Sequence, residues 1–140
     1  MSTDTAQPKD IFHLIPKPIW ENCKESKTPY KPSTYEQDGF IHATEDPKML
    51  LSVGNHFYKS VTEPFLLLRI DVTKLLDAPV KYEPAAPVGD TEAHSNKNDI
   101  LFPHIYGLLN ISCVVKEYVV LRSDEGTFLD IQGLDVWDKS

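Results

Sequence analysis

Three histidines interrupt short apolar segments of this 140-residue chain, and their placement constrains the fold more than any other feature. They are His13 in segment 11–15, His42 in segment 39–43, and His104 in segment 101–107. An imidazole buried among apolar side chains is costly unless it has a hydrogen-bond partner. Imidazole is also the side chain that exchanges protons most readily near neutral pH. The pattern therefore predicts either a shared pocket or histidines that neighbouring groups satisfy within the core.

The hydrophobic pattern predicts strands that outnumber helices. Strands are expected at residues 11–15, 39–43, 64–72, 80–83, 111–122 and 127–131. Helices are expected at residues 19–27 and from Asp46-Pro47 onward, where Asp can cap and Pro can occupy the first helical position. Loops are expected at residues 28–37 and 84–98, and the second is long enough to suggest a binding loop. Two early helices followed mainly by strands predict an α+β fold.

The chain is expected to form a single domain over residues 10–132. Its length suits one hydrophobic core, and its 41% hydrophobic and 25% charged residues are typical of a globular protein. The polar residues 1–9 are expected to be a disordered N-terminus, and residues 133–140 a C-terminal tail.

The net charge and the two cysteines limit which partners and which cellular location are expected for this chain. The net charge of −7 opposes nucleic-acid binding, which requires clustered Lys and Arg, and no apolar run is long enough to span a membrane. Cys23 and Cys113 lie far apart in the sequence, with no CxxC motif and no secretory signal, so free thiols and a cytoplasmic location are expected. A small-molecule ligand remains the expected partner, and protein partners stay open.

Two segments carry the residues best suited to chemistry. His42 and Thr44 share one face of the predicted strand, where the imidazole could act as a general base or contact a ligand. In the other segment, Pro103 and Gly107 predict a rigid turn that directs His104 and Tyr106 into a pocket wall. The alternatives are a buried His42 bonded to a carbonyl group and a turn whose aromatic rings fill the core.

The remaining histidines carry weaker signals. His13 lies between Phe12 and Leu14 and, by its context alone, is more typical of a satisfied core residue than of a ligand-binding one. A zinc site of three histidines, completed by Glu83, would need these side chains to converge, and no HxH or HxxxH spacing supports it. No metal is therefore expected. His56 and His94 are expected to be peripheral.

With these motifs together, the chain resembles the domain-of-unknown-function family 952 (DUF952) from about Ile11 to Leu129. The resemblance rests on an initial Ile-Phe-His-Leu strand, Trp20, the block Asp38-Gly39-Phe40-Ile41-His42, residues 68–71, Glu83, and the block Leu101-Phe102-Pro103-His104-Ile105-Tyr106-Gly107. This chain has Thr44 where Ser is usual, which keeps the hydroxyl. It has Leu108 where Pro is usual, which loosens the turn.

The resemblance implies an ADP-ribosylation-like fold, with a split and bent, mostly antiparallel sheet and a cleft for a nicotinamide dinucleotide. It implies that His13 holds a ribose, which makes His13 a candidate site residue. The usual late catalytic Glu has no secure counterpart, because Glu117 and Glu125 lie in unmatched contexts.

The leading hypothesis is therefore a pocket for NAD or an ADP-ribose-type nucleotide that transfers or hydrolyses an ADP-ribosyl group. The expected cofactor-binding residues are His13, Thr44 and Tyr106, and the expected catalytic residues are His42, His104 and Glu83. The alternatives are a non-catalytic small-molecule binding module and a small metallohydrolase.

Overall fold

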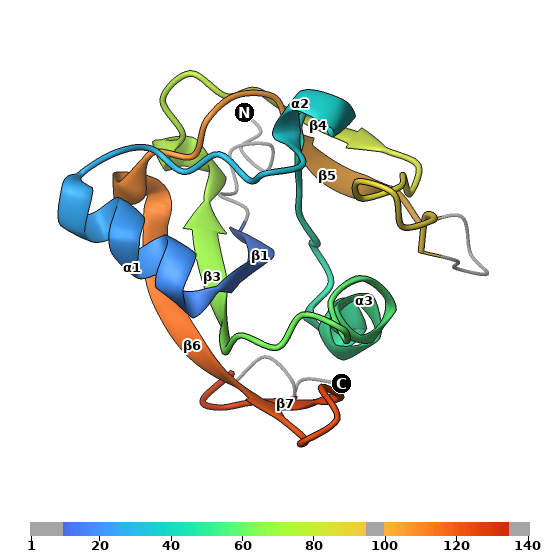
Figure 1. The fold of residues 1–140 in the computed structure, drawn as a ribbon. Helices are drawn as coiled ribbons and strands as arrows, with labels where there is room; N and C mark the ends of the chain where they lie inside the picture. The colour runs from blue at the N-terminus through green and yellow to red at the C-terminus, as the bar shows by residue number, and fades with distance from the viewer. Residues whose placement is uncertain (1–9, 95–99, 135–140) are drawn as a thin grey trace, which may run out of the picture.

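Two antiparallel sheets organise the chain, of which the computed structural model describes residues 10–94 and 100–134 (Figure 1). The larger sheet has the strand order β1-β3-β6-β7 and the smaller one β2-β5-β4. The larger sheet comprises β1 (Asp10–Pro16), β3 (Phe65–Asp71), β6 (Val114–Arg122) and β7 (Phe128–Ile131). The smaller sheet comprises β2 (Ile41–His42), β4 (Val80–Glu83) and β5 (Phe102–Ile105). The expected α+β fold with antiparallel strands is confirmed.

Three α-helices and three short 3-10 helices connect these strands within the described residues. The α-helices are α1 (Lys17–Ser26), α2 (Tyr35–Asp38) and α3 (Leu50–Phe57), and the 3-10 helices are Pro47–Met49, Val72–Lys74 and Ile111–Cys113. Asp46 caps the start of the second expected helix by accepting a hydrogen bond from the Lys48 amide, and Pro47 follows it. The four-residue helix α2 lies in the region expected to be a loop, so the expected two N-terminal helices become three.

A bridge between β1 and the chain just after β2 links the two sheets. The amide of Phe12 donates to the carbonyl oxygen of Thr44, and the Thr44 amide donates to that of Phe12, both at 2.8 Å. The free edge of β1 is thereby covered, and the larger sheet curls into a half-barrel against the smaller one (Figure 1). This bridge brings His13 of β1 next to His42 of β2.

The alternation of side chains along β1 places apolar residues in two cores. Ile11 and Ile15 face the first core, which Trp20 and Cys23 of α1 cover. Phe12 and Leu14 face the second core, together with Leu50 of α3 and residues of β3, β6 and β7. Strand β1 is therefore buried on both faces, as its apolar run predicts.

The segment around His104 differs from the expected turn. Residues 102–105 form β5, the central strand of the smaller sheet, with Tyr82 of β4 opposite Pro103. Pro103 has no amide hydrogen, but its carbonyl oxygen still accepts a hydrogen bond from the Ala43 amide at 3.1 Å. The prediction of a turn gave too much weight to Pro103. The strand tolerates this proline because its pairing with β2 ends there.

Several boundaries also differ from the sequence prediction. Residues 111–113 form a 3-10 helix before β6, so Cys113 lies in that helix rather than in a strand. Both Cys113 and Cys23 are free and buried. Leu134 is buried in the second core, so the packed region extends beyond residue 132, while residues 1–9 and 135–140 lie outside the described part of the chain.

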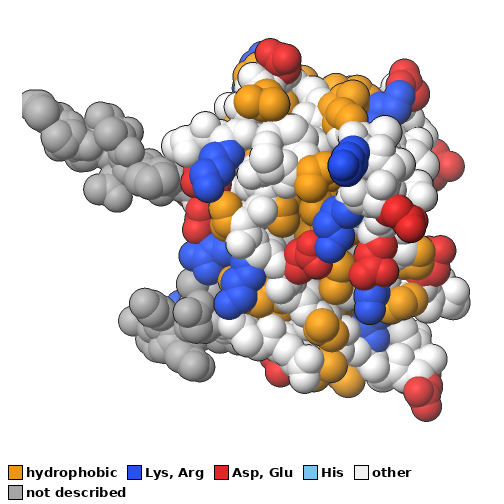
Figure 2. All heavy atoms as spheres, turned by 90° about the vertical axis from the view of Figure 1, so that its left-hand side faces the viewer, with side chains coloured by type: hydrophobic (Ala, Val, Ile, Leu, Met, Phe, Trp, Pro, Cys, Tyr) orange, Lys and Arg blue, Asp and Glu red, His pale blue; other side chains and the backbone are white. Residues whose placement is uncertain are grey.

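The face that carries α1 shows no large area of one charge sign. Figure 2 shows Lys and Arg interspersed with Asp and Glu on this face, with apolar side chains between them. On α1, Lys24 forms an ion pair with Glu117 of β6 at 2.7 Å, and Glu117 also accepts a hydrogen bond from Trp20. Among the described residues, no helix is long and apolar enough to cross a membrane.

Candidate functional site

The pairing of β2 with β5 places two histidines directly opposite each other. His42 and His104 are register partners, and their ring centroids lie 5.6 Å apart with the rings nearly perpendicular. The ring of Phe40 stacks on His104 at 4.1 Å and packs against His42 at 4.6 Å. The short pairing between these strands therefore fixes two imidazoles side by side against an aromatic ring.

The first imidazole is oriented by a carboxylate. His42 Nε2 lies 3.0 Å from Oδ2 of Asp38, the last residue of α2, whose side chain is only 5% exposed. Since a carboxylate only accepts hydrogen bonds, Nε2 carries the proton and Nδ1 keeps its lone pair. Burial lowers the pKa of His42, and the hydrogen bond and negative charge of Asp38 oppose that shift. The ring is therefore neutral near pH 7 and can accept a proton.

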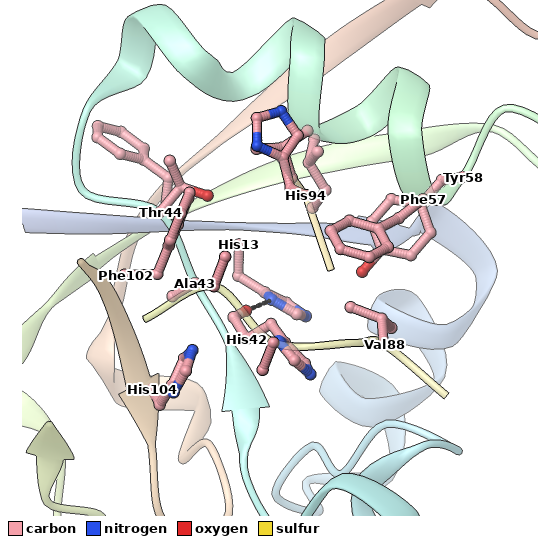
Figure 3. A pocket seen from close by; sticks show the side chains of 15 residues that line it. His13, His42, Ala43, Thr44, Phe57, Tyr58, Val88, His94, Phe102 and His104 are labelled. Atoms are coloured by element: carbon pink, nitrogen blue, oxygen red, sulfur yellow. Dashed lines mark hydrogen bonds between the residues drawn. The ribbon is translucent and has the colours of Figure 1, made fainter. Parts of the chain in front are cut away.

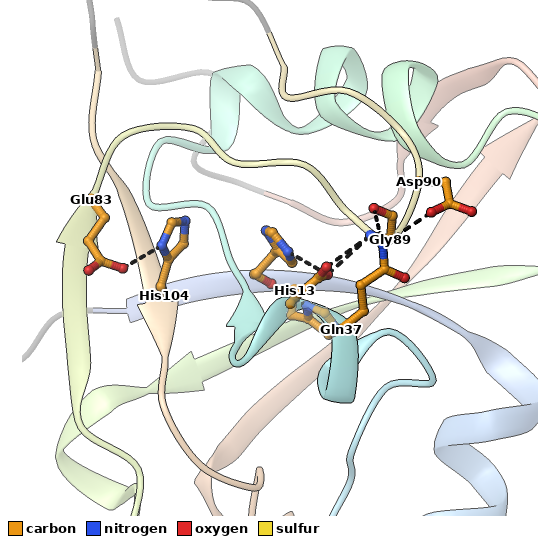
Figure 4. Close-up of polar contacts among 8 residues, drawn as sticks. His13, Gln37, Glu83, Gly89, Asp90 and His104 are labelled. Atoms are coloured by element: carbon orange, nitrogen blue, oxygen red, sulfur yellow. Dashed lines mark hydrogen bonds and ion pairs between the residues drawn. The ribbon is translucent and has the colours of Figure 1, made fainter.

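The second imidazole has a carboxylate of its own. His104 Nδ1 lies 2.8 Å from Oε1 of Glu83 on the neighbouring strand β4, and the Tyr106 hydroxyl donates to the same oxygen at 2.5 Å. Figure 4 shows the His104–Glu83 contact. The hydrogen bonds from Tyr106 and His104 lower the pKa of Glu83 despite its partial desolvation, so the carboxylate stays ionised. Nδ1 of His104 is therefore the donor, and Nε2 keeps its lone pair.

His13 is held by protein groups at both ring nitrogens. Nδ1 lies 2.6 Å from the carbonyl oxygen of His42, and Nε2 lies 3.2 Å from the Tyr30 hydroxyl. A carbonyl oxygen only accepts, so Nδ1 donates and Nε2 accepts from Tyr30. Burial lowers the pKa of His13 to about 4, with the hydrogen bond to His42 opposing the shift. His13 is thus a neutral residue that joins β1, β2 and the segment after α1.

Two adjoining cavities lie beside these histidines. The smaller one, called the chamber here, has a volume of about 30 Å³ and is lined by His13, His42, Thr44, His94 and His104 together with apolar side chains (Figure 3). The larger one, called the groove, has a volume of about 420 Å³. His13, His42, Phe57, Tyr58 and Val88 line both cavities, so the two adjoin each other.

Residues 85–91, called the strap here, run along both cavities. The first half of the strap lines the chamber, the second half lines the groove, and Val88 lines both. The Gly89 amide donates to the carboxylate of Asp38 at 3.1 Å, and the Gln37 side chain donates to the Gly89 carbonyl oxygen at 2.9 Å (Figure 4). Asp38 therefore holds both the strap and the ring of His42.

The structure brings together four of the six residues predicted for the site. The prediction that His13, His42 and His104 converge on one cavity is confirmed, and Thr44 joins them. Glu83 and Tyr106 do not line either cavity. Both lie behind His104, where the Tyr106 ring packs near Phe40 at 5.3 Å and under the Lys81 ammonium at 5.0 Å. Tyr106 is therefore not the cavity wall that the turn motif suggested.

Sequence reasoning missed four residues that shape the site. They are Tyr30, Asp38, Phe40 and His94. Asp38 and Phe40 precede His42 by four and two residues, so the block Asp38–His42 could have suggested both. His94 was expected to be peripheral, but it lines the chamber and its Nε2 lies 2.9 Å from the Ser52 hydroxyl. Tyr30 has no sequence signal, because only folding of the segment after α1 brings it to His13.

The described residues include no cluster of side chains suited to bind a metal ion. Over residues 10–94 and 100–134, no group of three or more His, Cys, Asp or Glu side chains is arranged to hold a metal ion. The imidazoles of His42 and His104 are instead bonded to carboxylates of the protein.

Comparisons with known proteins place the chain in one family and one fold. The family model described as "Protein of unknown function (DUF952)" matches residues 14–117. A search of curated proteins found no relative of the chain. The crystal structure of protein CC0527 from Caulobacter crescentus is 18% identical with a TM-score of 0.65, covering 86% of this chain and 94% of that protein.

A second structure of the same bacterial protein agrees. The solution NMR structure of CC0527 is 19% identical with a TM-score of 0.59, covering 89% of this chain and 92% of that protein. Likeness at this level of identity shows that the two proteins share a fold, and it assigns no activity.

Proposed function

The chain belongs to the DUF952 family, and we propose that it is an enzyme that performs acid–base chemistry on a small nucleotide-type ligand, of the NAD or ADP-ribose class. In this proposal the ligand lies in the groove and its reacting bond lies next to the paired histidines. His42 accepts a proton and later returns it, and Nε2 of His104 supplies a second lone pair beside it.

One observation carries the proposal: two carboxylate–imidazole pairs meet across two strands. Asp38 orients His42 and Glu83 orients His104, and the rings lie 5.6 Å apart beside the same chamber. A general base needs a lone pair that a second group holds in place, and its protonated form must be stabilised until the proton is passed on. Asp38 supplies both at His42, and Glu83 fixes the ring of His104 in the same way.

The ligand class rests on the groove and on the family resemblance. A volume of about 420 Å³ falls in the range of small-molecule sites. The groove has aromatic side chains against which a base could stack, namely Tyr30, Phe57, Tyr58 and Phe65. For polar contacts it has Lys31, Ser33, Thr34 and Thr91, and its lining also includes two carboxylates, Glu63 and Asp90. The ADP-ribosylation-like fold that the resemblance implies is part of this proposal.

The contacts give some site residues different roles from those expected from the sequence. His13 already uses both ring nitrogens within the protein, so it shapes the boundary between chamber and groove instead of holding a ribose directly. Glu83 positions His104 and does not reach the ligand. Thr44 retains its place as a polar group in the chamber lining.

The binding part of the proposal is tested by thermal shift with ADP-ribose, NAD and AMP. A ligand present at a hundredfold excess over its Kd should stabilise the protein by about 2.7 kcal/mol. Thr34→Trp, which should fill the groove, is expected to abolish that stabilisation. Absence of any shift with all three nucleotides would refute the ligand class.

The catalytic part is tested by the consumption of NAD or ADP-ribose, followed by chromatography of the products. His42→Gln should lower the rate about 100-fold or more, the usual contribution of a general base, and His104→Gln should lower it less, because it removes only the second imidazole of the pair. His56→Gln is the matched control, because His56 lines neither cavity. Equal rates in all three variants would refute the assigned roles.

A non-catalytic binding module is the second candidate, and one observation favours it. The chamber lining includes no carboxylate, since Asp38 and Glu83 lie behind the imidazoles that they orient. ADP-ribosyl chemistry develops positive charge at the ribose, which an anionic or hydrogen-bonding side chain must stabilise. Tight ADP-ribose binding without turnover of any nucleotide would identify the protein as such a module.

A further inference from the structure

We infer that the chamber is a binding site for the attacking water, so that the reaction at the paired histidines is a hydrolysis. This inference rests on the proposed function, because it names the second reactant of the same site. It decides between the two reactions, transfer and hydrolysis, that the ligand class leaves open.

The two cavities differ in size in the way that a hydrolytic site requires. The chamber volume of about 30 Å³ exceeds the roughly 10–15 Å³ that a cavity needs to hold one water molecule. The groove is more than ten times larger. A substrate in the groove and a water in the chamber would therefore meet at His42, which lines both cavities.

The polar atoms of the chamber suit a water molecule. Nδ1 of His94 is buried and has no hydrogen-bond partner among the described residues. In native proteins such an atom calls for an explanation, and an ordered water is a common one. The Ser52 hydroxyl bonds the other nitrogen of His94 in either direction, so Nδ1 is either a donor or an acceptor. Water satisfies both cases, because it donates and accepts.

Other groups provide the second and third contacts that a buried water usually makes. Thr44 adds a hydroxyl to the lining and is only 4% exposed. His42 and His104 add ring nitrogens that keep lone pairs. The rest of the lining is apolar, including Phe12, Val53 and Phe102, and this disfavours entry of a charged group in place of water.

The chemistry balances with water as the only co-reactant. Nδ1 of His42 takes one proton from the water while the water oxygen bonds to the electrophilic atom of the substrate. The bond to the leaving group breaks, its electron pair stays with the leaving group, and a basic leaving group takes the proton that His42 received from the water. The products are the hydroxylated substrate fragment and the protonated leaving group, and His42 is neutral again. If the leaving group is not basic, the proton on His42 returns to solvent.

A hydration measurement tests the water site independently of any ligand. A crystal structure of the protein at a resolution that shows ordered waters should place a water within hydrogen-bonding distance of His94 Nδ1. His94→Phe should lose that water while the fold is kept. A dry chamber in the unaltered protein, or a protein group occupying it, overturns the inference whatever the nucleotide screen gives.

A chamber-filling variant tests the link to hydrolysis. Ala86→Leu should extend a side chain from the strap into the chamber, lower NAD or ADP-ribose hydrolysis by about 100-fold, and leave the Kd for ADP-ribose within about twofold. Pro87→Ala is the control, since Pro87 is exposed on the same strap and lines neither cavity. A hydrated chamber combined with unchanged turnover in Ala86→Leu overturns the hydrolytic assignment.

The two proposals fail in distinguishable ways. If no nucleotide binds, the proposed function fails and the assignment of a hydrolysis falls with it, while the crystallographic water alone decides whether the chamber is a water site. If ADP-ribose binds and is converted only by transfer to an added acceptor, the function stands and the water inference falls.

Discussion

Nδ1 of His13 donates a hydrogen bond to the carbonyl oxygen of His42 at 2.6 Å, across 29 residues of sequence. This bond ties the edge strand of the larger sheet to the edge strand of the smaller one. It also ties the residue with the most strongly lowered histidine pKa to the backbone of the proposed general base. The stability of the fold and the geometry of the site therefore depend on the same neutral imidazole.

The pH dependence of stability should report this imidazole. The pKa of His13 is about 4 in the folded protein and about 6.5 when unfolded, so the unfolded chain binds more protons between these values. Stability is then lost as pH falls below about 6.5, by roughly 3 kcal/mol at pH 4 from this residue alone. Urea denaturation at pH 7 and pH 4.5 measures the loss.

His13→Gln separates this effect from the titration of carboxylates. Glutamine can also donate to the His42 carbonyl and accept from Tyr30, but it does not titrate. The difference in unfolding free energy between the two pH values should therefore be smaller in the variant. Identical pH dependence in the variant and the unaltered protein would contradict a neutral, buried His13.

Loss of the Tyr30 hydroxyl should destabilise the protein by about 1–3 kcal/mol, because it leaves the buried Nε2 of His13 without a donor. Tyr30→Phe keeps the ring, so packing in the first core is retained. Tyr35→Phe is the control, since Tyr35 is only partly buried at the edge of that core. The measurement is the urea midpoint of both variants at pH 7. A Tyr30→Phe midpoint equal to that of the control would argue against this hydrogen bond.

The sequence predicted most strands and the meeting of the histidines, because both follow from local apolar patterns. Strand β4 has the expected bounds, β3 is shorter than expected by one residue at each end, and β7 begins one residue later than expected. An imidazole in an apolar run must find a partner, and three such runs in one small domain converge on one cavity. Local patterns thus carry real information about which side chains meet.

The partners of those histidines depend on tertiary contacts that the sequence does not reveal. Glu83 meets His104 only because β4 pairs with β5, and Tyr106 reaches the same carboxylate only because residues 102–105 are a strand. Proline at position 103 suggested a turn, but the pairing of its neighbours prevails over that local preference. The contribution of Asp38 similarly requires α2, whose four residues are too few to show a helical period.

The two aromatic residues that flank His104 should respond oppositely to substitution. Phe102 is 7% exposed, so Phe102→Ala should destabilise the fold by about 3–5 kcal/mol. Tyr106 is half-buried, and Tyr106→Phe removes only its hydrogen bond to Glu83, so the loss should stay near 1 kcal/mol. Thermal and urea unfolding of both variants provide the comparison. A larger loss in Tyr106→Phe would show that the Glu83 contact, and not the buried ring, stabilises β5.

Neutralising Asp38 should release the strap. Asp38→Asn keeps the size of the side chain but removes the charge that accepts hydrogen bonds from both the Gly89 amide and His42. Hydrogen exchange at Gly89 should then become faster, while exchange in the middle of β3 stays unchanged. Gln37→Ala, which removes only the contact to the Gly89 carbonyl and Asp90, should give a smaller increase. Unchanged exchange at Gly89 in Asp38→Asn would show that other contacts hold the strap.

Alanine at position 54 should destabilise the protein, although alanine normally favours a helix over glycine by about 1 kcal/mol. A Cβ atom on Gly54 would lie 2.5 Å from Cδ2 of Phe128, whose ring packs in the second core and is only 2% exposed. Helix α3 must then move away from β7 or the ring must shift, at a cost of about 1–3 kcal/mol. Glu25→Ala, an exposed change in α1, serves as the control and should change stability by less than about 0.5 kcal/mol.

Because α3 also contributes Phe57 to both cavities, the same displacement of α3 should weaken ADP-ribose binding if that ligand occupies the groove. A stabilised Gly54→Ala variant would mean that α3 and β7 pack less tightly than these distances indicate.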